Sequence, residues 1–144
     1  MIRVAINGFG RIGRCVFRLL QNHPKIKVVA INDLADTKTL SHLLKYDSIH
    51  GIFNGDISNN EHHIIVNDEK IPLLNNTHPK NINWQPFNID YVIESSGKFK
   101  TNSVLKNHIK NGAKHVILSV PPIEDDIKTI VIGVNDNNIE GNEV

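Results

Sequence analysis

The fold of this chain is decided by one stretch near its start, Arg3-Val4-Ala5-Ile6-Asn7-Gly8-Phe9-Gly10-Arg11-Ile12-Gly13. Its first part is short, apolar and β-branched, and glycines follow at once, which is typical of a buried strand. Helical spacing of apolar residues begins at Arg11. A G-x-G-x-x-G pattern that follows a strand and opens a helix predicts a turn that binds the phosphates of a dinucleotide.

Each glycine of this pattern has its own physical role. Gly8 permits the tight turn, Gly10 lets the backbone approach a pyrophosphate, and Gly13 lets the helix pack close to the strand. The free N–H groups and positive end of the helix would then face the phosphates. The alternative interpretation is a glycine-rich turn that binds no ligand.

Asp33 lies 20 residues beyond Gly13, at the end of a second predicted strand over residues 27–31. A carboxylate at this distance can accept hydrogen bonds from the adenosine ribose hydroxyls. It would also repel the extra phosphate of NADP, since two unit charges about 4 Å apart repel by roughly 4 kcal/mol at an effective dielectric of about 20. The spacing therefore predicts NAD as the cofactor, and the alternative role of Asp33 is that of a helix cap.

Apolar runs alternate with helical patterns along the rest of the chain. Residues 63–66 and 71–74 flank a turn over 67–70 and predict a hairpin. We expect an α/β fold, a Rossmann-type doubly wound and mostly parallel sheet with a small hairpin insertion, as one domain over residues 1–144. The other predicted strands are 90–94, 115–119 and 129–133, and the predicted helices are 11–22, 37–45 and 101–111.

Composition excludes several classes of function. A formal net charge of +1 gives no basic field for nucleic acid, and no apolar run is long enough for a membrane span. The start does not read as a signal peptide, and Cys15 is the only cysteine, which favours a reducing cytoplasm. We expect Cys15 to be a small buried residue on an apolar helix face with Ile12, Val16, Leu19 and Leu20, and no histidine spacing predicts a metal site.

Several motifs in register resemble the phosphorylating, NAD-dependent glyceraldehyde-3-phosphate dehydrogenases. The opening signature is residues 5–14, and a second is Leu43-Leu44-Lys45-Tyr46-Asp47-Ser48-Ile49-His50-Gly51. Glu94-Ser95-Ser96-Gly97 with Phe99, Gly112-Ala113-Lys114 and Gly133-Val134-Asn135 follow in order and spacing. The resemblance covers essentially the whole chain.

The resemblance implies a set of cofactor-binding residues. Asn7 and the turn formed by Gly8, Phe9, Gly10, Arg11, Ile12 and Gly13 would cradle NAD, with the Arg11 and Ile12 backbones at the pyrophosphate. Asp33 would hold the adenosine ribose, Ser95, Ser96 and Gly97 would line the crevice, and Ser119 would lie near the nicotinamide. Serine is also an ordinary turn former, which is the alternative for Ser95. Two stretches depart from the family pattern: Thr77 replaces a basic residue near the adenine, where only a backbone contact could survive, and Val120-Pro121-Pro122-Ile123 differs from the usual loop.

The resemblance also implies what this chain lacks. Family members are roughly twice as long, and their nucleophilic cysteine and its partner histidine lie beyond residue 144. The resemblance implies a C-terminal catalytic domain in the full-length enzyme and a homo-oligomer, a tetramer in the family, for the full-length enzyme only. We therefore expect no catalytic residue in this chain, NAD binding without aldehyde oxidation, and an apolar patch left uncovered by the family's C-terminal helix. The alternatives are the cofactor domain of erythrose-4-phosphate dehydrogenase, a close relative, and a free-standing, non-catalytic NAD-binding module.

Overall fold

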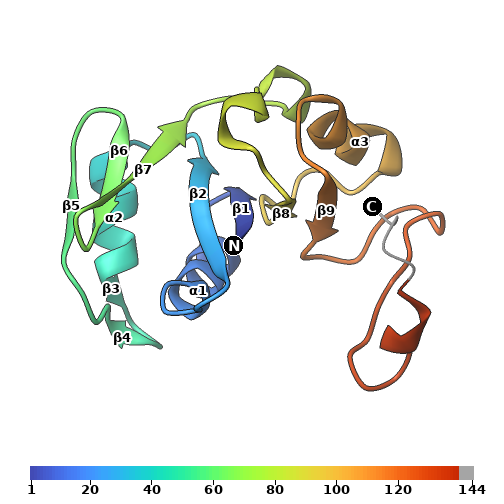
Figure 1. Ribbon diagram of the computed structural model, residues 1–144, viewed down its shortest axis with the longest axis horizontal. Coiled ribbons are helices and arrows are strands. Elements are labelled where there is room, and N and C mark those ends of the chain that lie inside the picture. Colours follow the sequence, from blue (N-terminus) through green and yellow to red (C-terminus); the bar gives the residue numbers. More distant parts are fainter. Residues whose placement is uncertain (140–144) are drawn as a thin grey trace.

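The architecture is a seven-stranded sheet with helices, seen in a computed structural model that describes residues 1–139. The strand order is β5-β6-β7-β2-β1-β8-β9, and β7, β2, β1, β8 and β9 run parallel to one another. Figure 1 shows β1 and β2 at the centre, with β5–β7 and α2 on one side and β8, β9 and α3 on the other. This is the predicted Rossmann-type α/β fold.

The main strands are β1 (Ile2–Asn7), β2 (Ile26–Asn32), β8 (Tyr91–Glu94) and β9 (His115–Leu118). The antiparallel part comprises β5 (Ile57–Asn59), β6 (His63–Val66) and β7 (Glu69–Leu74), and a separate small hairpin pairs β3 (Tyr46–Asp47) with β4 (Gly51–Ile52). The helices are α1 (Arg11–Leu20), α2 (Thr37–Lys45) and α3 (Asn102–Lys110), with short 3-10 turns η1 (Pro79–Asn81), η2 (Gln85–Phe87) and η3 (Asp136–Asn138).

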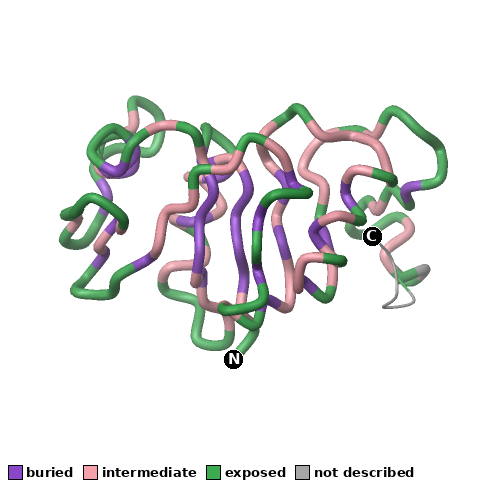
Figure 2. The backbone as a smooth tube through the Cα atoms, turned by 90° about the horizontal axis from the view of Figure 1, so that it is seen from above, coloured by how far each residue is buried: buried purple, intermediate pink, exposed green. Residues whose placement is uncertain are grey.

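Both faces of the sheet are covered by packed side chains. Successive residues of a strand point to opposite sides, so each central strand contributes side chains to both faces. Ile6 and Ile31 pack with Phe17 of α1 and Leu44 of α2 on one face. Their neighbours Ala5 and Ala30 pack on the other face with Trp84 and other side chains from the segment before β8. In Figure 2 the central strands are the most buried part of the backbone. Two separate cores on one sheet are what a doubly wound fold requires.

Most of the predicted elements are present within one or two residues of their expected ends. The helix over 37–45 has the predicted bounds, and the helix expected over 101–111 is α3, followed by Gly112 with a φ of +111°. The hairpin turn is tighter than predicted, since only Asn67 and Asp68 stand between β6 and β7, with φ of +47° and +66°. Two consecutive left-handed residues are the signature of a type I′ turn.

The predicted strand over 129–133 is wrong. The backbone there forms a turn, in which the Asn135 side chain accepts a hydrogen bond from Val131 N at 2.6 Å and donates to Thr129 O at 2.9 Å. An asparagine that bonds its own neighbouring backbone competes with pairing in a sheet. The apolar side chains of Ile132 and Val134 are consequently 88% and 78% exposed.

The predicted apolar face of the first helix is also wrong in part. Gly13 and Phe17 are the buried residues of α1, while Ile12 and Leu19 are 48% and 73% exposed and Cys15 is only half-buried. A Cβ at Gly13 would lie 2.3 Å from Gly8 O and 3.1 Å from the Ile6 side chain. The glycine thus fixes which face of α1 touches the sheet, and the i, i+4 neighbour Phe17 follows it inward.

Within residues 1–139, no helix is both long and apolar enough to cross a membrane.

Candidate dinucleotide-binding site

A cleft of about 270 Å³ lies at the carboxyl ends of β1, β2 and β8. In the sheet, β1 has β2 as its neighbour on one side and β8 on the other. The cleft therefore lies where the strand order reverses, which is where doubly wound sheets bind ligands. Its lining consists of polar strand ends and loop residues: Asn7, Gly8, Gly10, Asn32, Asp33, Leu34, Asn76, Thr77, Ser95, Ser96, Lys98 and Phe99.

The glycine turn has the geometry that its sequence predicts. Gly8 has a φ of +90°, and a Cβ there would lie 2.5 Å from the Ser96 backbone, so only glycine fits. A Cβ on Gly10, in contrast, would meet no atom within 4 Å. Gly10 is the N-cap of α1 and offers no side-chain cap, which leaves the first N–H groups of the helix for a ligand. The turn therefore forms an open cradle for an anion.

Asp33 holds the glycine turn in place from the end of β2. Its Oδ2 accepts a hydrogen bond from Phe9 N at 2.6 Å, and its Oδ1 accepts one from Ala35 N at 3.0 Å. The alternative role as a helix cap is excluded, because Asp36 caps α2 by accepting from Thr39 N. Asp33 thus presents a fixed negative charge at one end of the cleft.

Arg14 braces the same turn from inside α1. Its Nη1 donates to Phe9 O at 2.9 Å. Burial lowers the pKa of this guanidinium from its usual value, and the nearby carboxylates of Asp47 and Asp33 act in the opposite direction. The two backbone polar groups of Phe9 are consequently held by side chains of opposite charge, Asp33 and Arg14.

Asparagines at the ends of two neighbouring strands connect the residues at the Asp33 end of the cleft. Asn32 Nδ2 donates to Asn7 Oδ1 at 2.8 Å and to Asn76 O at 3.0 Å, while Asn32 Oδ1 accepts from Asn76 N at 2.9 Å. Asn7 and Asn32 are almost fully buried. These bonds fix the loop that carries Thr77 against the end of β2.

The serines after β8 close the cleft from the other side. Ser95 Oγ donates to Gly8 O at 2.7 Å, which clamps the glycine turn, so Ser95 acts through this bond in addition to forming a turn. Ser96 bonds the buried carboxylate of Glu94 through both its N–H, at 2.9 Å, and its hydroxyl. Glu94 itself lies behind the cleft and is fully buried.

The structure brings about half of the predicted site residues into the cleft. Asn7, Gly8, Gly10, Asp33, Thr77, Ser95 and Ser96 line it, whereas Phe9, Arg11, Ile12, Gly13, Gly97 and Ser119 do not. The Phe9 ring is buried in the core, edge-on to Phe17 at 5.6 Å, so its backbone alone faces the turn. Ser119 follows β9, and its Oγ is buried without a hydrogen-bond partner among the described residues.

Sequence reasoning missed Asn32, Leu34, Asn76, Lys98 and Phe99 as lining residues. Asn32 could have been predicted, because it is the last residue of its strand, as Asn7 is of β1. The ends of neighbouring parallel strands meet at one edge of the sheet, so polar residues there lie close together. Phe99 packs edge-on against His78 at 5.2 Å, a contact between two loops. Such a contact has no local signal in the sequence.

A larger hollow of about 710 Å³ lies along α2 and β5, away from the glycine turn. It is shallower, and it lacks convergent backbone N–H groups, since the N-terminus of α2 is already capped by Asp36. Size alone therefore does not decide the site. Within residues 1–139, no group of three or more His, Cys, Asp or Glu side chains could hold a metal ion.

Residues 2–102 match the family model described as "Glyceraldehyde 3-phosphate dehydrogenase, NAD binding domain". The chain belongs to this family. The glycine turn, Asp33 and the Ser95–Ser96 clamp all lie within the matched residues, and the cofactor of this domain family is NAD.

Curated relatives extend the similarity over nearly the whole chain. Glyceraldehyde-3-phosphate dehydrogenase 1 of Bacillus cereus is 46% identical over 135 residues, which is 94% of this chain and 40% of the relative. The glyceraldehyde-3-phosphate dehydrogenase of Thermotoga maritima is 46% identical over 142 residues, 97% of this chain and 42% of the relative. That of Geobacillus stearothermophilus is 45% identical over 139 residues. The chain spans about two fifths of the length of these relatives.

Proposed function

We propose that this chain is the NAD-binding part of a phosphorylating glyceraldehyde-3-phosphate dehydrogenase. The observation that carries the proposal is the cleft at the switch point, where the open Gly10 cradle and the uncapped start of α1 face an anion beside the fixed carboxylate of Asp33. When bound, NAD supplies an acceptor for the hydride of the aldehyde. The residues of this chain bind and orient the dinucleotide.

Each part of the cleft has a role in this proposal. Asn7 and the Gly8–Gly13 turn cradle the cofactor, with the α1 N-terminus and the Arg11 and Ile12 backbones at the pyrophosphate. Asp33 takes the adenosine ribose, and the Thr77 backbone approaches the adenine. Ser95, Ser96 and Gly97 follow toward the other end of the dinucleotide, and Ser119 stands near the nicotinamide.

The first test is calorimetric titration of the 144-residue chain with NAD and with NADP. We expect saturable binding of NAD and a preference over NADP of at least about tenfold, since about a third of the repulsion between two close charges suffices. A chain with native secondary structure that binds neither dinucleotide would refute the proposed function.

The chemistry is proposed to reside outside residues 1–144. The reaction class needs a thiol nucleophile and a histidine to move its proton, and Cys15 is half-buried on α1 rather than in the cleft. We expect the purified chain to produce no NADH from glyceraldehyde 3-phosphate, NAD and phosphate. NADH production by the chain alone would contradict this part.

The partner implied is a C-terminal catalytic domain, within a cytoplasmic homo-oligomer that is a tetramer in the family. Reading the coding sequence that follows codon 144 tests this directly. A segment with a Ser-Cys-Thr-Thr-like motif would support the dehydrogenase, and a stop codon with no separate catalytic half would favour a free-standing NAD-binding module. Erythrose-4-phosphate dehydrogenase is the second candidate enzyme, and comparing the two aldehydes as substrates of the complete enzyme separates them.

A further inference from the structure

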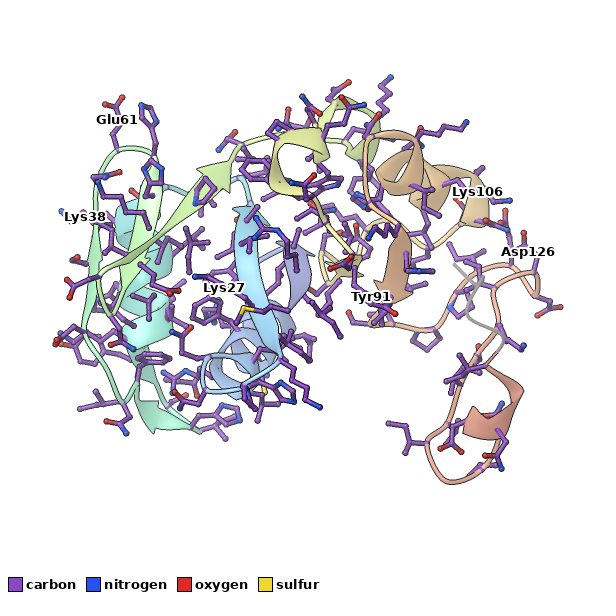
Figure 3. All side chains as sticks on the ribbon, viewed as in Figure 1. Lys27, Lys38, Glu61, Tyr91, Lys106 and Asp126 are labelled. Atoms are coloured by element: carbon purple, nitrogen blue, oxygen red, sulfur yellow. The ribbon has the colours of Figure 1, made fainter. Side chains whose placement is uncertain are left out.

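A buried chain of hydrogen bonds runs from the core under α3 to the back of the cofactor cleft. Trp84 Nε1 donates to His108 Nδ1 at 3.0 Å, and His108 Nε2 lies 3.1 Å from Glu94 Oε2. All three side chains are completely buried. His108 is fully buried on α3, whereas Lys106 of the same helix, labelled in Figure 3, is exposed.

The indole fixes the tautomer of the imidazole. An indole N–H can only donate, so His108 Nδ1 must carry the lone pair that accepts it. The ring proton of a neutral imidazole then resides on Nε2, which donates to Glu94. A proton on Nδ1 would set two donors against each other. Trp84 therefore leaves Nε2 as the ring nitrogen that donates to Glu94.

Glu94 connects this chain of hydrogen bonds to two residues that line the cleft. Its Oε2 also accepts from Asn7 Nδ2, and its Oε1 accepts from the N–H and the hydroxyl of Ser96. Four donors converge on the two oxygens, so the polar atoms of this fully buried side chain all have hydrogen-bond partners. Asn7 and Ser96 both line the cleft, one from the end of β1 and one from the segment that follows β8.

We propose that His108 is a positioning residue for the cofactor cleft, acting through Glu94 on Asn7 and Ser96, with Trp84 setting its tautomer. The proposal deepens the proposed NAD site and rests on it. His108 touches neither the cleft nor a cofactor in it. Its effect is to keep the Asn7 amide and the Ser96 backbone in the orientation that a dinucleotide meets.

The test compares His108→Gln with His108→Leu in the 144-residue chain. Glutamine keeps an N–H that can donate to Glu94 and an oxygen that can accept from Trp84, whereas leucine provides neither. We expect the side-chain amide signals of Asn7 and the backbone amide signal of Ser96, measured by ¹⁵N NMR without cofactor, to shift in the leucine variant and to return toward wild type in the glutamine variant. The Kd for NAD should rise about tenfold with leucine and by less than about threefold with glutamine.

Two further variants separate positioning from general stability. Leu105 lies on the same helix, is equally buried and packs against Val116 and Ile127, outside the hydrogen-bond chain. Leu105→Val should lower the melting temperature without moving the Asn7 or Ser96 signals or the Kd. Trp84→Phe keeps an aromatic ring but removes the indole donor, and the ¹⁵N shifts of His108 should then show loss of the single Nε2–H tautomer.

Different results would overturn the positioning role of His108 and the proposed function. Unmoved Asn7 and Ser96 signals in His108→Leu, or equal effects from Leu105→Val, would overturn the positioning role whatever the cofactor does. A wild-type chain that keeps the Nε2–H tautomer but binds no NAD would overturn the proposed function, and with it the role of His108 toward a cofactor.

Discussion

Asp33 is the residue on which we propose that cofactor choice depends. Its two oxygens already hold Phe9 N and Ala35 N, so the carboxylate is fixed at the mouth of the cleft before any dinucleotide enters. We predict that Asp33→Asn lowers the preference for NAD over NADP by at least about tenfold, because the repulsion of the extra phosphate disappears while an oxygen acceptor remains. Calorimetric titration with both dinucleotides measures the ratio.

The matched control for this change is Asp36→Asn. Asp36 is an exposed carboxylate three residues further on that caps α2 and does not line the cleft. It should leave the NAD-to-NADP ratio as it is. An unchanged ratio in Asp33→Asn, or an equal change in both variants, would mean that Asp33 does not select the cofactor.

Two glycines of the same turn separate folding from binding. Gly8→Ala places a Cβ 2.5 Å from the Ser96 backbone at a φ of +90°, so it should destabilise the chain by about 1–3 kcal/mol or more. Gly10→Ala places its Cβ in open space at a φ of −72°, and should cost less than about 1 kcal/mol as an N-cap change. We predict that Gly10→Ala nevertheless weakens NAD binding at least about tenfold, since the methyl group occupies the cradle.

Urea denaturation and NAD titration of both glycine variants check this pair. If Gly10→Ala bound NAD as wild type does, the cradle would not be where the pyrophosphate approaches. If Gly8→Ala were as stable as wild type, the close approach of the turn to Ser96 would be wrong.

At the scale of elements, the β3–β4 hairpin carries an acid-sensitive turn. Asp47 Oδ1 accepts from His50 N at 2.8 Å and Ile49 N at 2.9 Å, and these bonds lower the pKa of the carboxyl to about 2. A carboxyl with a folded-state pKa below its unfolded value of about 3.9 stabilises the fold above that value. This contribution is lost as the pH falls from about 4 through about 2.

We predict that Asp47→Asn flattens the fall of unfolding free energy in that pH window. The amide oxygen still accepts the two backbone bonds but cannot titrate. Urea denaturation at several pH values from neutral to about 2 gives the two profiles, and Glu61→Gln, at an exposed side chain with no such backbone bonds, serves as the comparison. Parallel acid limbs in Asp47→Asn and wild type would contradict the prediction.

Elements whose signals are local could be predicted from the sequence. Periodicity and glycine placement gave the β1–α1–β2 unit, α2 and α3 closely, because a strand followed by glycines or a helix ended by Gly112 needs only neighbouring residues. The segment 129–133 has the apolar content of a strand, yet the hydrogen bond from Val131 N to the Asn135 side chain holds its backbone in a turn. Whether an apolar run pairs as a strand depends on a free neighbouring edge and on competing side chains, and neither is visible in the run itself.

The candidate site, too, could be predicted only where its signals are local in the sequence. The glycine turn and Asp33 follow from spacing within one strand–helix–strand unit, whereas the contact of Glu94 with Asn7 joins residues 87 positions apart and that with His108 joins β8 to α3. A buried histidine on a helix gave no sign in the sequence of which partner it would meet. Only the assembled sheet brings these groups together.

At the scale of the whole molecule, four of the exposed apolar side chains lie on α1 and on the β3–β4 hairpin. Ile12 and Leu19 of α1 are 48% and 73% exposed, and Ile49 and Ile52 of the β3–β4 hairpin are 75% and 70% exposed. Arg18 of α1 is bonded to the hairpin, since its Nη2 donates to Gly51 O of β4 at 3.1 Å. Exposed apolar side chains that form a contiguous surface favour association with another surface.

We predict that the 144-residue chain self-associates as its concentration rises, and that the double change Leu19→Lys with Ile52→Lys suppresses this without lowering NAD affinity. Both side chains lie outside the cleft and are already in solvent, so the lysines add charge without disturbing packing. Sedimentation velocity over a concentration series measures the effect, with Ile123→Lys as the control because Ile123 is 73% exposed on the segment after β9. A wild-type chain that stays monomeric throughout, or an Ile123→Lys variant that suppresses association equally, would show that the α1 and hairpin surface does not drive it.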